Sequence, residues 1–191
     1  MLKWAWIQAD DIQFPGHTNT ETAELIHQVA KAHFPTASKI LQPQEIHSTL
    51  VYIGCDVNDT LIDCLREVDL EAMNFQCNIL APHQGDSNTK MIMLSIQADA
   101  FSEAFHRVWT ALEAAGIHPA HTKQDETRYK YGFSAHLTLA EFDDENAATD
   151  AMAHLDVKKF FSDLKDIRSL TVKNFFLYGD NSEGHSTQVF L

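Results

Sequence analysis

Two short stretches of the sequence carry the same tetrad, H-x-T-L, in which an imidazole and a hydroxyl stand two residues apart. The first, at 46–50, contains His47 and Thr49, and the second, at 135–139, contains His136 and Thr138. Both tetrads lie in apolar runs typical of β-strands, where side chains alternate between the two faces. Each histidine is therefore expected to share one strand face with the threonine that follows it.

The repetition carries more weight than either tetrad alone. With 11 histidines in the chain, H-x-T arises by chance about once and H-x-T-L about 0.1 times. A single pair is most simply a core histidine bonded to its neighbour, but two identical tetrads favour a functional pair. A third H-x-T, at His185 and Thr187, lacks the leucine and has no helix after it, so we assign it no catalytic role.

Helical and extended segments alternate around the tetrads in two similar rounds. Hydrophobic spacing predicts helices at 18–34, 57–68, 99–116 and about 144–155. Strands are expected at 2–10, 42–54, 74–85, 89–97, 130–142, 169–179 and 186–191. No linker rich in Pro, Gly or Ser divides the chain, so we expect a single α+β domain over 1–191 with two related lobes.

Charge and composition narrow the possible partners. The net charge is −13, from 14 Lys and Arg against 27 Asp and Glu, which disfavours extended binding along a nucleic-acid backbone. A small anionic ligand in a local pocket remains compatible with this charge. No apolar run approaches the length of a membrane span, and the three cysteines show no zinc spacing. We therefore expect a soluble cytoplasmic protein with no metal and no cofactor.

Two histidine–threonine pairs facing each other fit acid–base chemistry at a phosphate. Histidine titrates near neutrality, so one imidazole can take a proton from an attacking hydroxyl or water while the other protonates the leaving oxygen. A threonine hydroxyl can donate a hydrogen bond to a non-bridging oxygen of the reacting group. This arrangement suits in-line displacement and requires no metal.

On these motifs the chain resembles the 2H phosphoesterase superfamily, the LigT-like group, named for two H-x-T/S-x motifs, one in each half. The stretch PQEIHSTLVYIG matches the first motif, with Pro43 a few residues ahead. The stretch FSAHLTLAEF departs from the second, because Ala135 stands where many members carry proline. The resemblance implies a bilobal α+β fold: two pseudo-symmetric lobes of antiparallel sheet, with outer helices, curving around a central water-filled groove.

The resemblance also implies an activity. It points to a metal-independent phosphodiesterase acting on RNA 2′,3′-cyclic phosphate ends, cyclic nucleotides or 2′–5′ oligonucleotides. His47 and His136 would be the general acid and base, and Thr49 and Thr138 the phosphate-binding hydroxyls. Two alternatives stay open: a hydrolase of cyclic oligonucleotide signals, as in evasion of host defence, and a non-catalytic RNA- or nucleotide-binding module. The oligomeric state is not predicted.

Residues outside the tetrads give weaker predictions. Arg128, Lys130 and Tyr131 form the one locally basic, aromatic stretch and are candidate substrate contacts, although a solvated charged loop is the favoured explanation. Strict alternation from His47 turns Tyr52 away from the groove and into the core. Trp4 and Trp6 share one face of the first strand, which leaves two positions open, lining the groove or in the core. Large aromatics on strands are more often core residues, so the core is favoured for both. At helical spacing the core is expected for Phe101, Phe105 and Trp109.

Overall fold

The computed structural model describes residues 5–73, 75–85, 89–117, 135–180 and 186–191. Its strands are β1 (Trp6–Gln13), β2 (Lys39–Ile40), β3 (Ser48–Tyr52), β4 (Gln76–Gln84), β5 (Met91–Gln97), β6 (His136–Glu141), β7 (Ser169–Asp180) and β8 (Ser186–Phe190). Its helices are α1 (Asn19–His33), α2 (Asp59–Arg66), α3 (Asp99–Ala114), α5 (Glu145–Ala153) and α6 (Val157–Asp163), with 3₁₀ turns η1 (Pro43–Glu45) and η2 (Leu70–Ala72). The α+β class expected from the sequence is confirmed.

The strands form one continuous curved sheet that runs through both lobes. Their order is β2-β6-β5-β4-β7-β1-β3, with β8 added to β7, and neighbouring strands run antiparallel. Strand β7 joins the two parts because it is long enough to pair twice. Its start, Ser169–Thr171, pairs with β4, and the stretch from Thr171 to Tyr178 pairs with β1.

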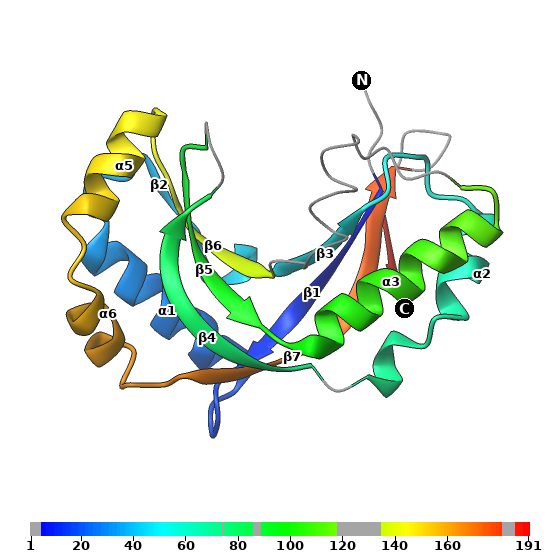
Figure 1. Ribbon diagram of the computed structural model, residues 1–191, viewed down its shortest axis with the longest axis horizontal. Helices are drawn as coiled ribbons and strands as arrows, with labels where there is room; N and C mark the ends of the chain where they lie inside the picture. Colours follow the sequence, from blue (N-terminus) through cyan, green and yellow to red (C-terminus); the bar gives the residue numbers. More distant parts are fainter. Residues whose placement is uncertain (1–4, 74, 86–88, 118–134, 181–185) are drawn as a thin grey trace.

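Two halves result, each carrying one tetrad strand (Figure 1). The His47 half contains β1, β3, β7 and β8 with α2 and α3 outside them, and the His136 half contains β2, β4, β5 and β6 with α1, α5 and α6. The helices are exchanged relative to the chain order. Helix α1 precedes the first tetrad but contacts β6 of the second as well as β1, and α3 precedes the second tetrad but contacts β3 of the first.

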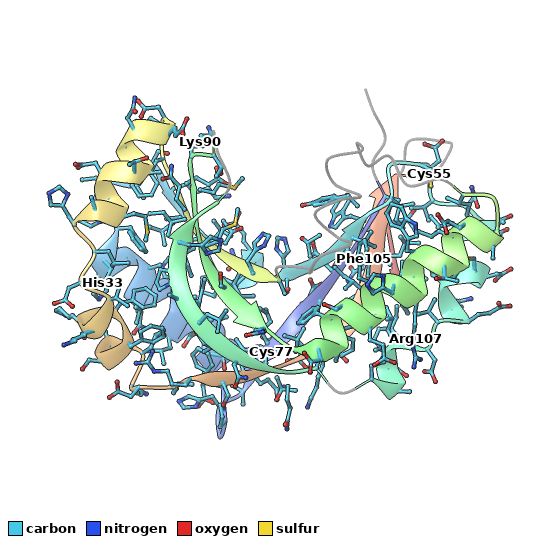
Figure 2. All side chains as sticks on the ribbon, in the orientation of Figure 1. His33, Cys55, Cys77, Lys90, Phe105 and Arg107 are labelled. Atoms are coloured by element: carbon cyan, nitrogen blue, oxygen red, sulfur yellow. The ribbon has the colours of Figure 1, made fainter. Side chains whose placement is uncertain are left out.

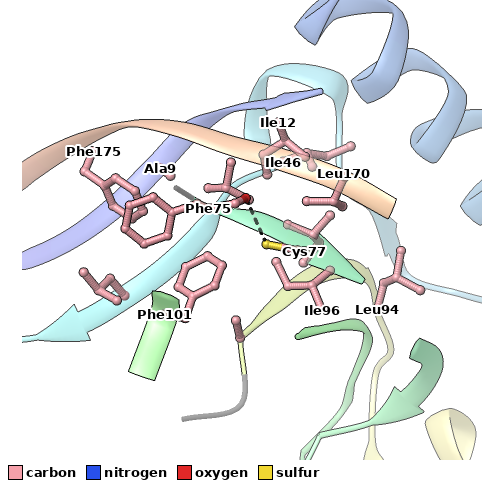
Figure 3. Packing of buried hydrophobic residues seen from close by; sticks show 14 of the residues in the cluster. Ala9, Ile12, Ile46, Phe75, Cys77, Leu94, Ile96, Phe101, Leu170 and Phe175 are labelled. Atoms are coloured by element: carbon pink, nitrogen blue, oxygen red, sulfur yellow. Dashed lines mark hydrogen bonds between the residues drawn. The ribbon is translucent and has the colours of Figure 1, made fainter. Parts of the chain in front are cut away.

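One face of the sheet is buried in a hydrophobic core, which explains why buried and accessible side chains alternate along most strands. Phe75, Phe101 and Phe175 pack together from η2–β4, α3 and β7, with ring centroids 4.6 to 6.3 Å apart (Figure 3). Phe101 and Phe105 are buried as expected, and Trp109 packs at the edge of the same core. In Figure 2, Phe105 and Arg107 mark the inner and outer sides of α3. Burial raises the pKa of the Cys77 thiol to about 12, so this cysteine behaves as a small apolar residue.

Four short elements were not predicted: α6, β2, η1 and η2. Helix α6 has only seven residues, too few to show a helical period, and its buried side chains are the adjacent Phe160 and Phe161. Strand β2 has two residues, and η1 occupies part of the stretch 42–54 that was predicted to be a strand throughout. Tertiary contacts hold these pieces in place, because local propensity alone does not stabilise elements this short.

Candidate functional site

The first tetrad begins directly after η1, and this turn orients His47. The Nδ1 of His47 lies 2.8 Å from the backbone carbonyl of Glu45, so Nδ1 carries the proton and donates it. The other ring nitrogen, Nε2, then has its lone pair available for proton transfer in the neutral form. The same ring lines an open cavity of about 470 Å³.

Glu45 is itself held on both sides. One carboxylate oxygen accepts from the Lys39 ammonium at 2.8 Å, and the other accepts from the Gln42 backbone N–H at 2.8 Å. The hydrogen bond from Lys39, and to a smaller extent the one from Gln42, holds the pKa of the Glu45 carboxyl below its usual value. Lys39 belongs to β2, which pairs with β6 through Lys39 and Glu141. The turn that orients His47 is therefore tied to the strand that carries His136.

A β-bulge follows the threonine of each tetrad. In the pairing of β1 with β3, Gln8 lies opposite Thr49 and Ile7 lies opposite Val51, so Leu50 is skipped. In the pairing of β5 with β6, Met93 lies opposite Thr138 and Ile92 lies opposite Ala140, so Leu139 is skipped. A bulge adds one residue to one strand and shifts the alternation that follows it. The leucine of H-x-T-L is the bulged residue in both halves.

Burial through the two tetrads follows this pattern. Ser48, Leu50, Leu137 and Leu139 are buried, as expected for side chains facing away from the groove, while His47, Thr49, His136 and Thr138 are half-buried. After each leucine comes a second buried residue, Val51 in β3 and Ala140 in β6. Strands β3 and β6 contact each other where the two halves meet. Each half thus presents one imidazole and one hydroxyl from the same strand face.

The bulge corrects the prediction for Tyr52, which is not a core residue. Its side chain is 46% exposed, and it lies opposite Trp6 in the pairing of β1 with β3. Strict alternation would place Tyr52 on the buried face, opposite the face of His47 and Thr49. The extra residue at Leu50 shifts the alternation by one, so Tyr52 lies on the same face as Thr49.

Trp6 is also outside the core, so of the two positions left open by the sequence the less favoured one, lining the groove, is the one observed. It is half-buried and lines the cavity together with Gln8, His47 and Tyr52. Its indole ring stacks on Tyr178 of β7, with centroids 5.6 Å apart and planes 15° apart. Trp4 lies outside the described residues.

A row of hydrogen bonds fixes the side chains along this face of β1. The Trp6 indole N–H donates to the Gln8 side-chain oxygen at 2.8 Å, and the Gln8 amide donates to Asp10 at 2.7 Å. The Tyr178 hydroxyl donates to the second oxygen of Asp10. Burial and then Asp10 raise the pKa of the Tyr178 phenol. Alternation within WIQAD places positions 6, 8 and 10 on one face, so the sequence carries a signal for this row.

The second tetrad lies beside a different pair of polar groups. His136 lies opposite Ser95 in the pairing of β5 with β6. The Ser95 hydroxyl is 2.9 Å from Nδ1 of His83, a residue of β4. Burial lowers the pKa of His83, which favours its neutral form. The sequence does not predict a place for His83 or Ser95 in the site, because their proximity depends on the pairing of three strands.

Several predicted residues lie outside the part of the chain that the structure describes. These are the candidate substrate contacts Arg128, Lys130 and Tyr131, and the third-motif histidine His185. Thr187 lies on β8, opposite Gly179 of β7. Among the described residues, no group of three or more His, Cys, Asp or Glu side chains is arranged to hold a metal ion. Within the same ranges, no helix is long and apolar enough to cross a membrane.

No protein-family model matches the chain, and no curated protein does either. Solved structures do. Escherichia coli LigT complexed with phosphate is 16% identical and superposes with a TM-score of 0.56, covering 99% of this chain and 94% of that one. The protein TT0787 of Thermus thermophilus gives a TM-score of 0.56 at 16% identity, covering 98% of this chain and 94% of that one.

A yeast protein extends the comparison. Kluyveromyces marxianus Usb1 with uridine monophosphate gives a TM-score of 0.53 at 10% identity, covering 100% of this chain and 99% of that one. The chain has the 2H phosphoesterase fold. In this fold His136–Leu139 lies in β6 and Ser48–Leu50 in β3, with His47 directly before β3, and these two strands contact each other between the halves.

Proposed function

We propose that this protein is a metal-independent phosphodiesterase in which His47 and His136 transfer protons while Thr49 and Thr138 bind the phosphate. The observation that carries the proposal is the repeated tetrad geometry: in each half, an imidazole and a hydroxyl leave one strand face just before the same bulge. Residues 1–191 would form a single domain.

The location that we propose is the cytoplasm. The three free cysteines of the chain fit a reducing compartment of this kind.

The chemistry follows from two imidazoles flanking one phosphorus. One imidazole takes the proton of the attacking hydroxyl or water, and the other protonates the oxygen that leaves from the opposite side. The two threonine hydroxyls donate to non-bridging oxygens, whose negative charge is stabilised as the bond breaks. His47 is suited to this role, because its Nδ1–H is committed to the Glu45 carbonyl and its Nε2 is available.

We further propose that the substrate is a small nucleotide or an RNA end, whose base stacks in the cavity beside His47. Trp6 and Tyr52 line this cavity, and Gln8 offers an amide for the base edge. Base stacking on an aromatic side chain contributes about 1–3 kcal/mol. Solved structures with the same fold support a nucleotide ligand: LigT is complexed with 3′-AMP, ATP or NADP+, and Usb1 with uridine monophosphate.

The test is incubation of the protein with a panel of phosphodiesters in the presence of EDTA, with products identified by mass. The panel contains 2′,3′-cyclic nucleotides, RNA oligomers with 2′,3′-cyclic ends, 2′–5′ and 3′–5′ oligoadenylates, and cyclic di- and trinucleotides. Cleavage is expected to persist in EDTA. His47→Ala and His136→Ala should each lower turnover by about 10²–10⁴. The matched control is His154→Ala, which removes an exposed histidine that follows α5 and should leave turnover unchanged.

The panel also separates the alternatives. Cleavage of the cyclic oligonucleotides alone would identify a hydrolase of nucleotide signals. Binding of several members without cleavage would identify a nucleotide-binding module and contradict the proposed chemistry. Full activity in either tetrad variant would remove that histidine from the mechanism, and complete inhibition by EDTA would replace it with a metal-dependent one.

A further inference from the structure

His83 and Ser95 form a polar pair on the same sheet face as the second tetrad. Ser95 lies directly opposite His136, and Met93 lies directly opposite Thr138. Side chains of directly opposed residues stand on the same face, with Cβ atoms about 4.5–5.5 Å apart. All four of these side chains are half-buried, whereas the intervening Leu94 and Leu137 are fully buried.

His83 reaches this face from the next strand. It lies opposite Met93 in the pairing of β4 with β5, and from there its Nδ1 makes the 2.9 Å contact with the Ser95 hydroxyl. Diagonal neighbours on adjacent strands are within reach of long or aromatic side chains. The result is a row across three strands, His83, Ser95 and His136, in which Ser95 stands between the two imidazoles.

The other half contains a row of the same form. Gln8 lies opposite Thr49 and Ala9 opposite Ser48, and the Gln8 amide donates a hydrogen bond to Asp10, two residues further along β1. Asp10 accepts a hydrogen bond from Tyr178, which comes from the third strand, β7. In both halves, therefore, a polar residue on the strand next to the tetrad strand is held by a side chain from the strand beyond. The chemistry differs: an ionisable carboxylate in one half, a neutral hydroxyl in the other.

We propose that His83 and Ser95 are positioning residues for His136, in which His83 holds the Ser95 hydroxyl against the His136 ring and so fixes the orientation of that ring for proton transfer. A hydroxyl both donates and accepts hydrogen bonds. The hydrogen bond with His83 therefore fixes the rotation of the Ser95 hydroxyl and leaves its other hydrogen-bonding direction for His136. Burial lowers the pKa of His83 and so favours its neutral form, which avoids a positive charge beside an imidazole that must itself gain and lose a proton. The catalytic consequence of this inference rests on the proposed function, whereas the contact between His83 and Ser95 does not depend on it.

The test combines a readout without substrate and a readout with it. Imidazole ¹⁵N resonances of His136 report its tautomer and hydrogen bonding in the ligand-free protein. Ser95→Ala and His83→Leu should both shift these resonances, while Ser95→Thr, which retains the hydroxyl, should keep the wild-type values. Ser169→Ala is the matched control, because Ser169 is an exposed strand residue of β7, and it should shift nothing.

With a substrate found by the panel, Ser95→Ala should lower kcat by about 10–100-fold, the cost of a misplaced catalytic group, and leave KM within about twofold. Unchanged His136 resonances in both Ser95→Ala and His83→Leu would overturn the proposal. Should one variant fail to fold, judged by circular dichroism, the other decides. Because the resonances need no substrate, a shifted His136 together with a silent panel would uphold the positioning pair and contradict the proposed function instead.

Discussion

Leu50 and Leu139 occupy equivalent positions in the two halves: each is the residue that its partner strand skips, and each directly follows the threonine of a tetrad. Both side chains are almost completely buried. The two tetrads therefore share a backbone irregularity as well as side chains. A bulge bends its strand and increases the local twist, which suits a sheet that curves between two halves.

The first prediction concerns the stability that Leu50 contributes. Leu50→Ala should lower the free energy of unfolding by about 2–5 kcal/mol, because it leaves a cavity beneath the bulge. The matched control is Leu80→Ala on β4, whose side chain is 48% exposed; its effect should stay within about 0.5 kcal/mol. Urea unfolding followed by circular dichroism measures both. Equal effects in the two variants would contradict the burial assigned to the bulged leucine.

The second prediction concerns Ser48, which stands between His47 and Thr49 and faces the core. Its hydroxyl is buried and, among the described residues, has no hydrogen-bond partner. An unpaired buried polar group costs about 1–3 kcal/mol. Ser48→Ala should therefore leave the free energy of unfolding unchanged or raise it by about 1 kcal/mol. Exposed Ser169→Ala serves as the reference, and a clear loss of stability in Ser48→Ala alone would show that the hydroxyl is satisfied in solution.

The third prediction tests the position of Tyr52 on the cavity face. Tyr52→Ala should change the free energy of unfolding by less than about 1 kcal/mol, because the side chain is half exposed. The same change should weaken binding of 3′-AMP about 5–150-fold, the equivalent of losing about 1–3 kcal/mol of stacking. Calorimetric titration provides the affinities, and Tyr52→Phe, which keeps the ring, should bind as the wild type does. A large stability loss with unchanged binding would return Tyr52 to the core.

The fourth prediction is a pH dependence of stability from Tyr178. Its raised pKa means that the folded chain retains the phenolic proton at pH values where the unfolded chain has lost it. The contribution of Tyr178 to stability is therefore complete below the ordinary tyrosine pKa of about 10 and disappears as the pH rises through the raised value. Tyr178→Phe should make the decline in unfolding free energy above about pH 10 shallower.

Two measurements check this. Urea unfolding at about pH 9 and about pH 11 compares the decline in the two proteins. Absorbance titration of the phenols should show that the tyrosine missing from Tyr178→Phe is one that ionises late. If the missing phenol titrates at the ordinary value instead, its hydrogen bond to Asp10 does not persist in solution.

The sequence determined the chemical identity of the candidate site. A histidine and a threonine two residues apart on a strand share a face by local geometry alone, and this holds for His47 with Thr49 and for His136 with Thr138. The long amphipathic helices and most strands were predictable for the same reason, since their period of 3.6 or 2 is a property of the local chain. The α+β class followed from their order.

Only the tertiary structure decided how these pieces come together. The bulges at Leu50 and Leu139 depend on pairing with β1 and β5, and the bulge at Leu50 places Tyr52 on the cavity face instead of in the predicted core. The exchange of α1 and α3 between halves, the double pairing of β7 and the contact of His83 with Ser95 join residues far apart in the chain. Strand register and helix packing depend on which surfaces bury each other in the folded chain. The hydrophobic pattern of one segment does not specify which distant segment it will pack against.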